Sequence, residues 1–381
     1  MNWAGVMLLK PSFNIAWVQA AVLEDVPSPA LVFGLDAIQA NLLKMVAVAG
    51  GTERLRPHVK THKLPGLIQR QLALGITRFK CATIAEAEMC AKAGAPDVLV
   101  AYPLVGPNVG RWLALQQKYP GTNFSTVADD PSAWRALAAA ADKAGTRIEV
   151  LLDIDIGQHR TGLPPGPAAV AAYRELVGLR SIIAGGLHAY DGHLQIPDPK
   201  ERAAACAAGI APVLALRDEL RGLGLPVPRV VAGGTPTFPF HAARRDVECS
   251  PGTSVLWDAC YATILPDLEF QNAAVLLTRV VSKPAEDRLC LDLGHKAVAS
   301  EMPHPRVFFP DLPDAEAVMH SEEHLVLKTP QARRFAVGDK LLAVPWHICP
   351  TVALHAEAIL VEQGRLDGSW PIEARARKLT I

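Results

Sequence analysis

NFSTVADDPSAWRALAAAADKAGTRIEVLLDID, residues 123–155, contains the repeating unit that decides the fold of this chain. Both ends of the stretch are strand-like apolar runs. The segment between them carries apolar residues at helical spacing and ends at Gly145. A strand, a helix and a second strand in this order predict a parallel βαβ unit. The chain has 381 residues, enough for several such units and a smaller second domain.

Similar runs recur on both sides of this unit, between about residues 54 and 252. They are LRPHVKT at 55–61, RFKCATI at 78–84, DVLVAYP at 97–103, AGGLHAYDG at 184–192, RVVAGGT at 229–235 and DVECSPG at 246–252. With the two strands of the first stretch they make eight, separated by helical segments. Eight alternating units predict a (β/α)₈ TIM-type barrel, and a doubly wound open sheet is the structural alternative.

The pattern changes after about residue 270, where strand-like runs are separated by turn residues with little helical periodicity. These runs are AAVLLTRVVSK, DRLCLDLG, HLVLKT, KLLAVPWHI and EAILVEQGRL. We therefore expect a barrel of residues 27–270. Residues 1–26 and 271–381 are expected to form a second, antiparallel β domain.

Charge and cysteine content narrow the class of protein. Lys plus Arg and Asp plus Glu are both 38, so the formal net charge is zero and we expect no nucleic-acid partner. The apolar N-terminal stretch is too short to span a bilayer and lacks the features of a secretory signal, so no membrane partner is expected. Seven cysteines without a CxxC pair indicate a cytoplasmic protein, in which six of them are reduced and mostly buried thiols; Cys349 is the exception.

A barrel carries its working residues at the C-terminal ends of its strands, and this rule selects Lys60. Lys60 ends the first run, in RPHVKTHK at 56–63. A lysine in a barrel mouth, desolvated and near other cations, has a lowered pKa and a free amine for Schiff-base chemistry. The structural alternative is a surface lysine in a basic loop.

The ends of strands seven and eight have the composition of a phosphate site. They read AGGT at 232–235 and SPGTS at 250–254. Barrels often bind phosphate there, because glycine lets backbone N–H groups approach the oxygens and Thr or Ser adds hydroxyl donors. Glycines that serve only the turns are the alternative.

Polar residues also end strands five and six, in DIDIGQHRTG at 153–162 and HAYDGH at 188–193. They place carboxylates and imidazoles around the same mouth, where acid–base roles are expected. Hydrogen-bonded residues of the rim are the alternative for any one of them.

A separate pair of candidate metal ligands, His347 and Cys349, follows a strand of the β domain. Residues two apart on a strand share one face, so the imidazole and the thiolate can bind one ion. The thiolate favours zinc over the harder magnesium or manganese. A buried cysteine beside a structural histidine is the alternative.

With these residues in view, the chain resembles the fold-type III pyridoxal-phosphate enzymes, and most closely the D-threonine aldolase and D-serine dehydratase family. The resemblance runs from residue 28 to residue 375. Its most specific pieces are RPHVKTHK at 56–63, GQHRTG at 157–162, LHAYDGH at 187–193, AGGT at 232–235, VSKPAEDR at 281–288, EEH at 322–324 and HICPTVALH at 347–355. It implies a homodimer that acts on a small D-β-hydroxy-α-amino acid.

The resemblance also implies roles for the candidate residues. Lys60 would hold the cofactor as a Schiff base, with His58 among the cofactor-binding residues, and Arg160 and Tyr190 would lie near the pyridine ring. His347 and Cys349 would bind a divalent metal (zinc, manganese or magnesium) that contacts the β-hydroxyl of the substrate. The cofactor phosphate would be held by Gly233, Gly234, Thr235, Gly252, Thr253 and Ser254.

The expected reaction is retro-aldol cleavage, which gives glycine and an aldehyde. A D-serine or D-3-hydroxyaspartate type dehydratase, giving a 2-oxo acid and ammonia, is the alternative; an amino-acid racemase or a non-catalytic pyridoxal-phosphate-binding protein comes third. Cys349 follows the dehydratase pattern, since the aldolases usually carry Asp there. Asp191 stands where aldolases can carry His, which leaves His193 and His188 as candidates for the base.

Overall fold

The computed structural model describes residues 13–381, which fall into two compact units. One comprises residues 13–44 together with Thr61–Leu64 and Thr253–Arg375. The other comprises Met45–Lys60, Pro65–Gly252 and Ala376–Ile381. The predicted domain boundaries stay a prediction, and residues 1–12 of the predicted N-terminal segment lie outside the described residues.

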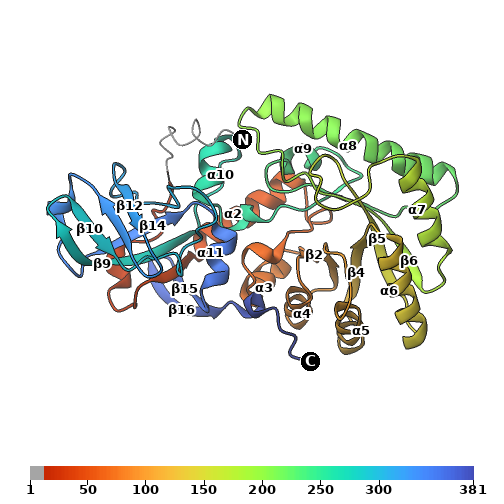
Figure 1. Ribbon diagram of the computed structural model, residues 1–381, viewed down its shortest axis with the longest axis horizontal. Helices are drawn as coiled ribbons and strands as arrows, with labels where there is room; N and C mark the ends of the chain where they lie inside the picture. The colour runs from red at the N-terminus through yellow and green to blue at the C-terminus, as the bar shows by residue number, and fades with distance from the viewer. Residues whose placement is uncertain (1–12) are drawn as a thin grey trace. The chain divides into compact units, whose positions relative to one another are not determined.

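The second of these units is built on a seven-stranded parallel sheet whose strands follow one another in chain order. Figure 1 shows helices α4 to α8 around the outside of these strands. The strands are β2 (Arg78–Cys81), β3 (Asp97–Val100), β4 (Asn123–Ala128), β5 (Ile148–Ile154), β6 (Ile182–Ala189), β7 (Val230–Ala232) and β8 (Glu248–Cys249). The helices are α3 (Pro65–Ala73), α4 (Ile84–Lys92), α5 (Asn108–Lys118), α6 (Pro131–Ala144), α7 (Pro167–Gly178), α8 (Pro199–Gly222) and α9 (Phe238–Ala242).

The segment expected to be the first barrel strand lies between the two edges of this sheet. Leu55 forms a parallel bridge with Cys249 of β8, and His58 forms one with Lys80 of β2. The predicted TIM-type barrel is thereby confirmed. Its first strand, however, is reduced to these two bridges and runs into a 3₁₀ helix, η2 (Val59–Thr61). Pro57 lacks the N–H that a regular strand would donate, although its carbonyl accepts from the Lys80 amide at 2.9 Å.

Arg56 connects this irregular strand to the neighbouring strands through buried ion pairs. Its side chain is fully buried and makes ion pairs with Asp97 at 2.6 Å and Glu248 at 2.7 Å. Burial opposes the charge on Arg56, but the two carboxylates outweigh it and raise the pKa of the guanidinium. The ion pairs therefore tie the closing segment to the starts of β3 and β8.

The other unit holds a nine-stranded sheet with a central path β12-β13-β10-β9-β1-β15-β16, while β14 pairs with β9 and β11. All its pairs are antiparallel except β1 with β15, so the predicted antiparallel domain contains one parallel pair. Residues 30–34, which the predicted boundaries assign to the barrel, form β1 of this sheet. The strands are β1 (Ala30–Gly34), β9 (Ala274–Ala285), β10 (Arg288–Leu291), β11 (Val307–Phe308), β12 (Glu316–His320), β13 (Leu325–Lys328), β14 (Lys340–Pro345), β15 (Glu357–Glu362) and β16 (Arg365–Pro371).

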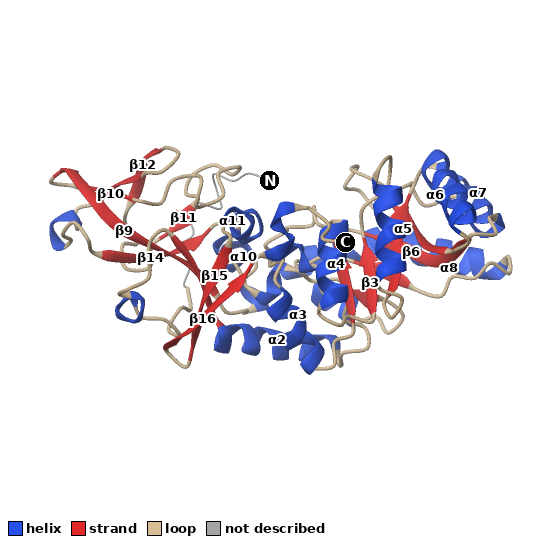
Figure 2. Cartoon of the chain, turned by 90° about the horizontal axis from the view of Figure 1, so that it is seen from below, coloured by secondary structure: helices blue, strands red, loops and turns tan. Residues whose placement is uncertain are grey.

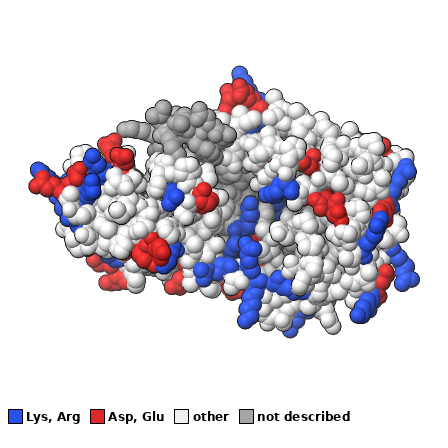
Figure 3. All heavy atoms as spheres, viewed as in Figure 1, with Lys and Arg blue, Asp and Glu red and all other residues white. Residues whose placement is uncertain are grey.

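One long helix and several short helical elements complete the chain, and Figure 2 shows how little helix accompanies β9 to β16. The remaining helices are α2 (Leu35–Ala49), α10 (Ala259–Ile264) and α11 (Ile348–Leu354), with the 3₁₀ helices η1 (Ala20–Leu23), η3 (Thr253–Val255), η4 (Pro266–Leu268), η5 (Ala332–Arg334) and η6 (Glu373–Ala376). Within residues 13–381, no helix combines the length and apolar character needed to cross a membrane. The face drawn in Figure 3 carries basic and acidic side chains among a larger area of other residues.

Candidate active site

Lys60 lies in η2, directly after the closing segment of the barrel. Its backbone N–H donates to Nδ1 of His58 at 3.3 Å, which fixes the turn that carries the lysine. Its Nζ lies 5.9 Å from the centroid of the Tyr190 ring. The structure thus brings together Lys60, His58 and Tyr190, three of the residues expected to surround the cofactor.

Tyr190 is the centre of a cluster of cations. Besides Lys60, the Arg160 guanidinium lies 5.1 Å and Lys80 Nζ lies 5.4 Å from the ring centroid. Each distance is within the range of cation–π attraction. Three basic side chains around one aromatic ring form a local positive environment, suited to an anionic ring compound such as pyridoxal phosphate.

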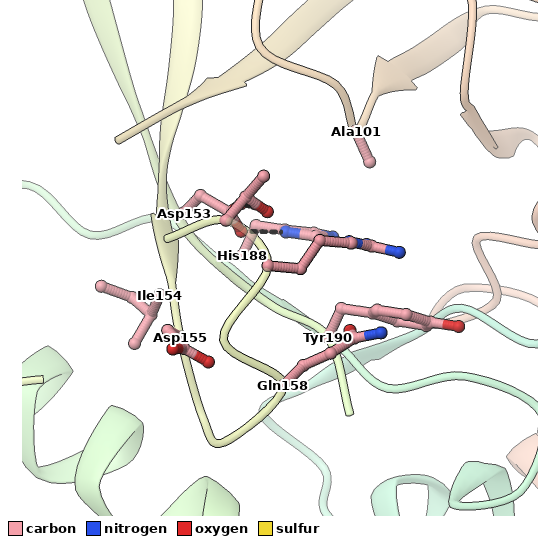
Figure 4. A pocket seen from close by; sticks show the side chains of 9 residues that line it. Ala101, Asp153, Ile154, Asp155, Gln158, His188 and Tyr190 are labelled. Carbon is pink, nitrogen blue, oxygen red and sulfur yellow. Dashed lines mark hydrogen bonds and ion pairs between the residues drawn. The ribbon is translucent and has the colours of Figure 1, made fainter. Parts of the chain in front are cut away.

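Beside this cluster is a pocket whose lining includes Asp153, Gln158, Arg160, His188 and Tyr190 (Figure 4). Asp153 Oδ1 lies 2.7 Å from His188 Nδ1, and Asp153 Oδ2 accepts a hydrogen bond from Thr161 at 2.8 Å. Burial lowers the pKa of His188, although Asp153 pulls it the other way. A neutral His188 therefore donates from Nδ1 and turns Nε2 toward Lys80, 3.5 Å away.

The two histidines considered as bases have different surroundings. His188 is buried and committed to Asp153, whereas His193 is exposed. Gly157 approaches His193 so closely that a Cβ on the glycine would lie 3.2 Å from the imidazole Nε2. Position 157 therefore leaves room for the His193 ring at the mouth formed by the loops after β5 and β6.

Lys80 is the functional candidate that the sequence pattern did not single out. It lies in β2 within the run RFKCATI, which indicates a buried strand. In the folded chain Lys80 is 1% exposed. The available signal was a lysine between two apolar residues, Phe79 and Cys81, because a buried lysine is rare unless it is paired or functional.

The expected phosphate loops meet inside the barrel unit. The Gly252 amide donates to the Thr235 hydroxyl at 3.0 Å, so the ends of β7 and β8 lie side by side. Gly233 has a φ of 79°, and a Cβ there would lie 2.4 Å from His241 Cδ2. The Ser250 hydroxyl is buried without a hydrogen-bond partner among the described residues, as is that of Ser254 in the other unit. Within the barrel unit, the Ser250 hydroxyl and the backbone at Gly233 fit an anionic phosphate.

The buried carboxylate of Asp191 contacts residues of the segment that follows β7. It is 1% exposed, accepts from the Thr237 hydroxyl at 2.7 Å and lies 2.7 Å from His241 Nε2. Thr237 in turn accepts from the Gly234 amide at 3.4 Å. Ligand atoms of Asp191, Cys206 and His241 lie within 4.8 Å of one another, close enough to hold a metal. The Asp191–His241 spacing is nevertheless that of a direct hydrogen bond, so we assign the cluster a structural role.

His347 and Cys349 are adjacent at the start of a helix, whereas the sequence predicts that they share one face of a strand. The strand β14 ends at Pro345; His347 is the N-cap of α11 and Cys349 lies in its first turn. His347 Nδ1 lies 2.5 Å from Glu301 Oε1. Burial disfavours the imidazolium, yet hydrogen bonds with Cys349 and Glu301 raise the pKa of His347 to about 10.

This donor set fits a divalent metal. A metal-ligating histidine usually donates its second ring N–H to a carboxylate, as His347 does to Glu301. Cys349 Sγ also lies 3.3 Å from the Thr61 hydroxyl and 3.7 Å from that of Thr253. Thr253, expected at the cofactor phosphate, is thus a neighbour of the candidate metal pair within its unit.

Two protein-family models match separate parts of the chain. Residues 34–258 match the family of the alanine racemase N-terminal domain, and residues 273–361 match a putative serine dehydratase domain. The chain is 32% identical over 359 residues to a D-threonine aldolase of Arthrobacter sp, covering 93% of this chain and 94% of that protein.

Solved structures give the same result. The fold is similar to the crystal structure of a D-threonine aldolase from Filomicrobium marinum, with a TM-score of 0.86 and 32% identity over 94% of this chain and 98% of that one. A D-threo-3-hydroxyaspartate dehydratase from Delftia sp. HT23 gives a TM-score of 0.81 and 26% identity, covering 92% and 98% of the two chains.

Proposed function

The chain belongs to the alanine-racemase-like, fold-type III pyridoxal-phosphate lyases, and on that basis we propose that it cleaves D-β-hydroxy-α-amino acids by a retro-aldol reaction. The products are glycine and an aldehyde. The observation that carries the proposal is the Lys60 amine in the cluster of cations around Tyr190. When bound, the cofactor supplies the electron sink that accepts the electron pair left on Cα as the Cα–Cβ bond breaks.

The barrel unit holds the cofactor in this proposal. Lys60 provides the amine for the covalent bond, with His58 fixing its turn, and Arg160 and Tyr190 flank the ring. The phosphate ligands that we propose in this unit are Gly233, Gly234, Thr235 and Gly252; Thr253 and Ser254, the remaining proposed ligands, follow Gly252 directly in the chain. The polar groups and glycine-only positions described above support this assignment.

His347 and Cys349 hold a divalent metal, zinc by preference for the thiolate and otherwise manganese or magnesium. A metal bound there would supply Lewis acidity toward the β-hydroxyl of the substrate. His193 takes the β-hydroxyl proton, because its imidazole is exposed at the mouth while His188 is committed to Asp153. Product analysis of the variant His193→Ala with its cofactor bound tests this role, and full activity would contradict it.

Dehydration to a 2-oxo acid and ammonia is the second candidate. Cys349 favours it, because a cysteine at this position is the dehydratase pattern, and the similarity to the Delftia dehydratase points the same way. Both reactions use Lys60 and a metal, so the ligand set alone does not separate them. A homodimer in the cytoplasm is the accompanying proposal for the state of the protein.

Product analysis separates the two reactions. Purified, cofactor-loaded protein is given D-threonine, with L-threonine as the matched control, in the presence and absence of a chelator. Glycine and acetaldehyde from the D-isomer, lost with the chelator, support the aldolase. Formation of 2-oxobutyrate and ammonia would instead identify a dehydratase. Formation of L-threonine alone would identify a racemase and contradict both lyase reactions.

A further inference from the structure

The segment HICPTVALH at 347–355 contains two residues, Thr351 and His355, that the proposed reaction leaves without a role. Together with His347 they are spaced four residues apart, through helix α11 and the residues that cap its two ends. Side chains at this spacing lie on one face of a helix. All three contact the same part of the chain, residues 297–301.

Residues 297–301 form neither helix nor strand, and they pass along this face of α11 in the opposite direction. Every second residue of the segment meets every fourth residue of the helix region. The contacts join Ala297 to His355 at 2.8 Å, Ala299 to Thr351 at 3.1 Å and Glu301 to His347 at 2.5 Å. The position of Glu301 is therefore determined along the whole length of α11.

Thr351 is the central link, because its hydroxyl makes two hydrogen bonds. The residue is fully buried, donates to the His347 carbonyl at 2.8 Å and accepts from the Ala299 amide at 3.1 Å. At the far end His355 donates from Nε2 to the Ala297 carbonyl, since a carbonyl oxygen can only accept. These bonds hold the backbone of the segment against the turn that carries His347.

Glu301 contacts the ring nitrogen of His347 that a metal would leave unused. Its carboxylate lies at Nδ1, which leaves Nε2 as the nitrogen available to an ion. The ligand atoms of Glu301, His347 and Cys349 do not all lie within 4.8 Å of one another, so Glu301 is not placed as a third ligand. A carboxylate outside the ligand set fixes the tautomer and the orientation of a ligating imidazole.

We propose that Glu301 is a positioning residue for the metal, and that Thr351 and His355 hold it against His347. This inference rests on the proposed role of His347 and Cys349 as metal ligands. With Nδ1–H donated to Glu301, the lone pair of the imidazole is on Nε2, and the ring is oriented before an ion binds. The affinity of the site therefore depends on residues that do not touch the metal.

The test compares zinc affinity, measured by competition with a chelating dye, among full-length proteins loaded with pyridoxal phosphate. The variants are Glu301→Gln, Glu301→Ala and Thr351→Val. Glu286→Gln, at an exposed position of the same unit, is the control for the glutamate. Thr263→Val is the control for the threonine, because Thr263 is a buried residue of α10 that donates to the carbonyl four residues earlier at 2.7 Å, as Thr351 does.

The dissociation constant for zinc is expected to rise about 10- to 100-fold in Glu301→Ala. It should rise less in Glu301→Gln, because the amide oxygen still accepts the hydrogen bond but carries no charge. Thr351→Val should weaken binding in the same direction, and both controls should match the wild type. Equal constants in the wild type and Glu301→Ala would overturn the role of Glu301. Equal constants in Thr351→Val and Thr263→Val would overturn the role of Thr351.

The ligand-field spectrum of the cobalt-substituted protein separates a positioning residue from a ligand. At saturating cobalt, Glu301→Gln should keep the wild-type band intensities, because the set of ligands is unchanged. A large change in intensity would mean a changed coordination number and would also overturn the proposal. Circular dichroism and the visible absorbance of the cofactor check the fold of each variant. Failure of the wild type to bind zinc would instead contradict His347 and Cys349 as metal ligands.

Discussion

Cys349 is the residue whose chemistry bears most on the metal. Its thiol lies at the first turn of α11 beside His347, and both hydroxyls near it belong to threonines. Threonine hydroxyls are weak ligands, so the thiolate and the imidazole dominate the affinity of the site.

Replacing Cys349 with alanine is expected to remove the metal and leave the cofactor. We expect Cys349→Ala to lose bound metal in elemental analysis and most of its lyase activity, while it keeps the visible absorbance of the cofactor. Cys290→Ala, a change in a half-buried cysteine of β10, is the matched control and should keep both. Full metal content in Cys349→Ala would show that the metal binds elsewhere, with the cluster of Asp191, Cys206 and His241 as the next place to look.

The sequence predicted which residues belong to the candidate site better than it predicted the surroundings of each residue. The sequence placed Lys60 at a barrel mouth and paired His347 with Cys349. It did not predict that a helix N-terminus, and not a strand face, makes that pair. Lys80 was missed because its run indicates an ordinary buried strand, and only folding shows that its side chain meets Tyr190 and His188.

Among the elements, the loop after β7 depends on the buried carboxylate of Asp191. The carboxylate accepts a hydrogen bond from the Thr237 hydroxyl, which itself accepts one from the Gly234 amide. It also contacts the His241 imidazole, which packs on Gly233. Asparagine has nearly the same shape but loses the charge that strengthens both hydrogen bonds.

Asp191→Asn is therefore expected to weaken binding of the cofactor phosphate. The dissociation constant for pyridoxal phosphate should rise about tenfold, which corresponds to about 1.4 kcal/mol. The constant for pyridoxal, which lacks the phosphate, should change much less. Asp218→Asn, at an exposed position of α8, is the control. An equal loss of affinity for both compounds would mean that Asp191 does not act on the phosphate loop.

The closing segment of the barrel gives a second prediction at this scale. Arg56→Met leaves Asp97 and Glu248 without their buried partner, and we expect the free energy of unfolding to fall by about 3 kcal/mol. Thermal unfolding measures the change. Arg135→Met removes the exposed ion pair with Glu175 and should leave the midpoint of unfolding almost unchanged. Similar midpoints for both variants would contradict the role given to Arg56.

The periodic elements were predictable, because apolar spacing records which faces are buried. All seven runs from 78 to 252 contain strands of the parallel sheet. The run at 55–61 is also apolar in part, but Pro57 lacks a backbone N–H, and only two isolated bridges pair this segment with the sheet. Strand β1 was not separated from the barrel, since its partners β9 and β15 lie more than 200 residues later in the chain.

At the scale of the whole molecule, zero net charge leaves anion binding to local groups. In the barrel unit, Lys60, Lys80 and Arg160 provide these local groups around Tyr190.

The oligomeric state is also a property of the whole molecule. We expect sedimentation equilibrium of the cofactor-loaded protein to give twice the mass of the 40.8 kDa chain, and the mass of a single chain would refute the proposed homodimer.

The central claim is that Lys60 carries the cofactor, and Lys80 is the competing amine in the same barrel. Borohydride reduction of the cofactor-loaded protein, followed by peptide mass spectrometry, locates the lysine that becomes covalently labelled. The account predicts the label on the peptide containing Lys60, and its loss in Lys60→Ala. A label on Lys80, or unchanged labelling in Lys60→Ala, would contradict it.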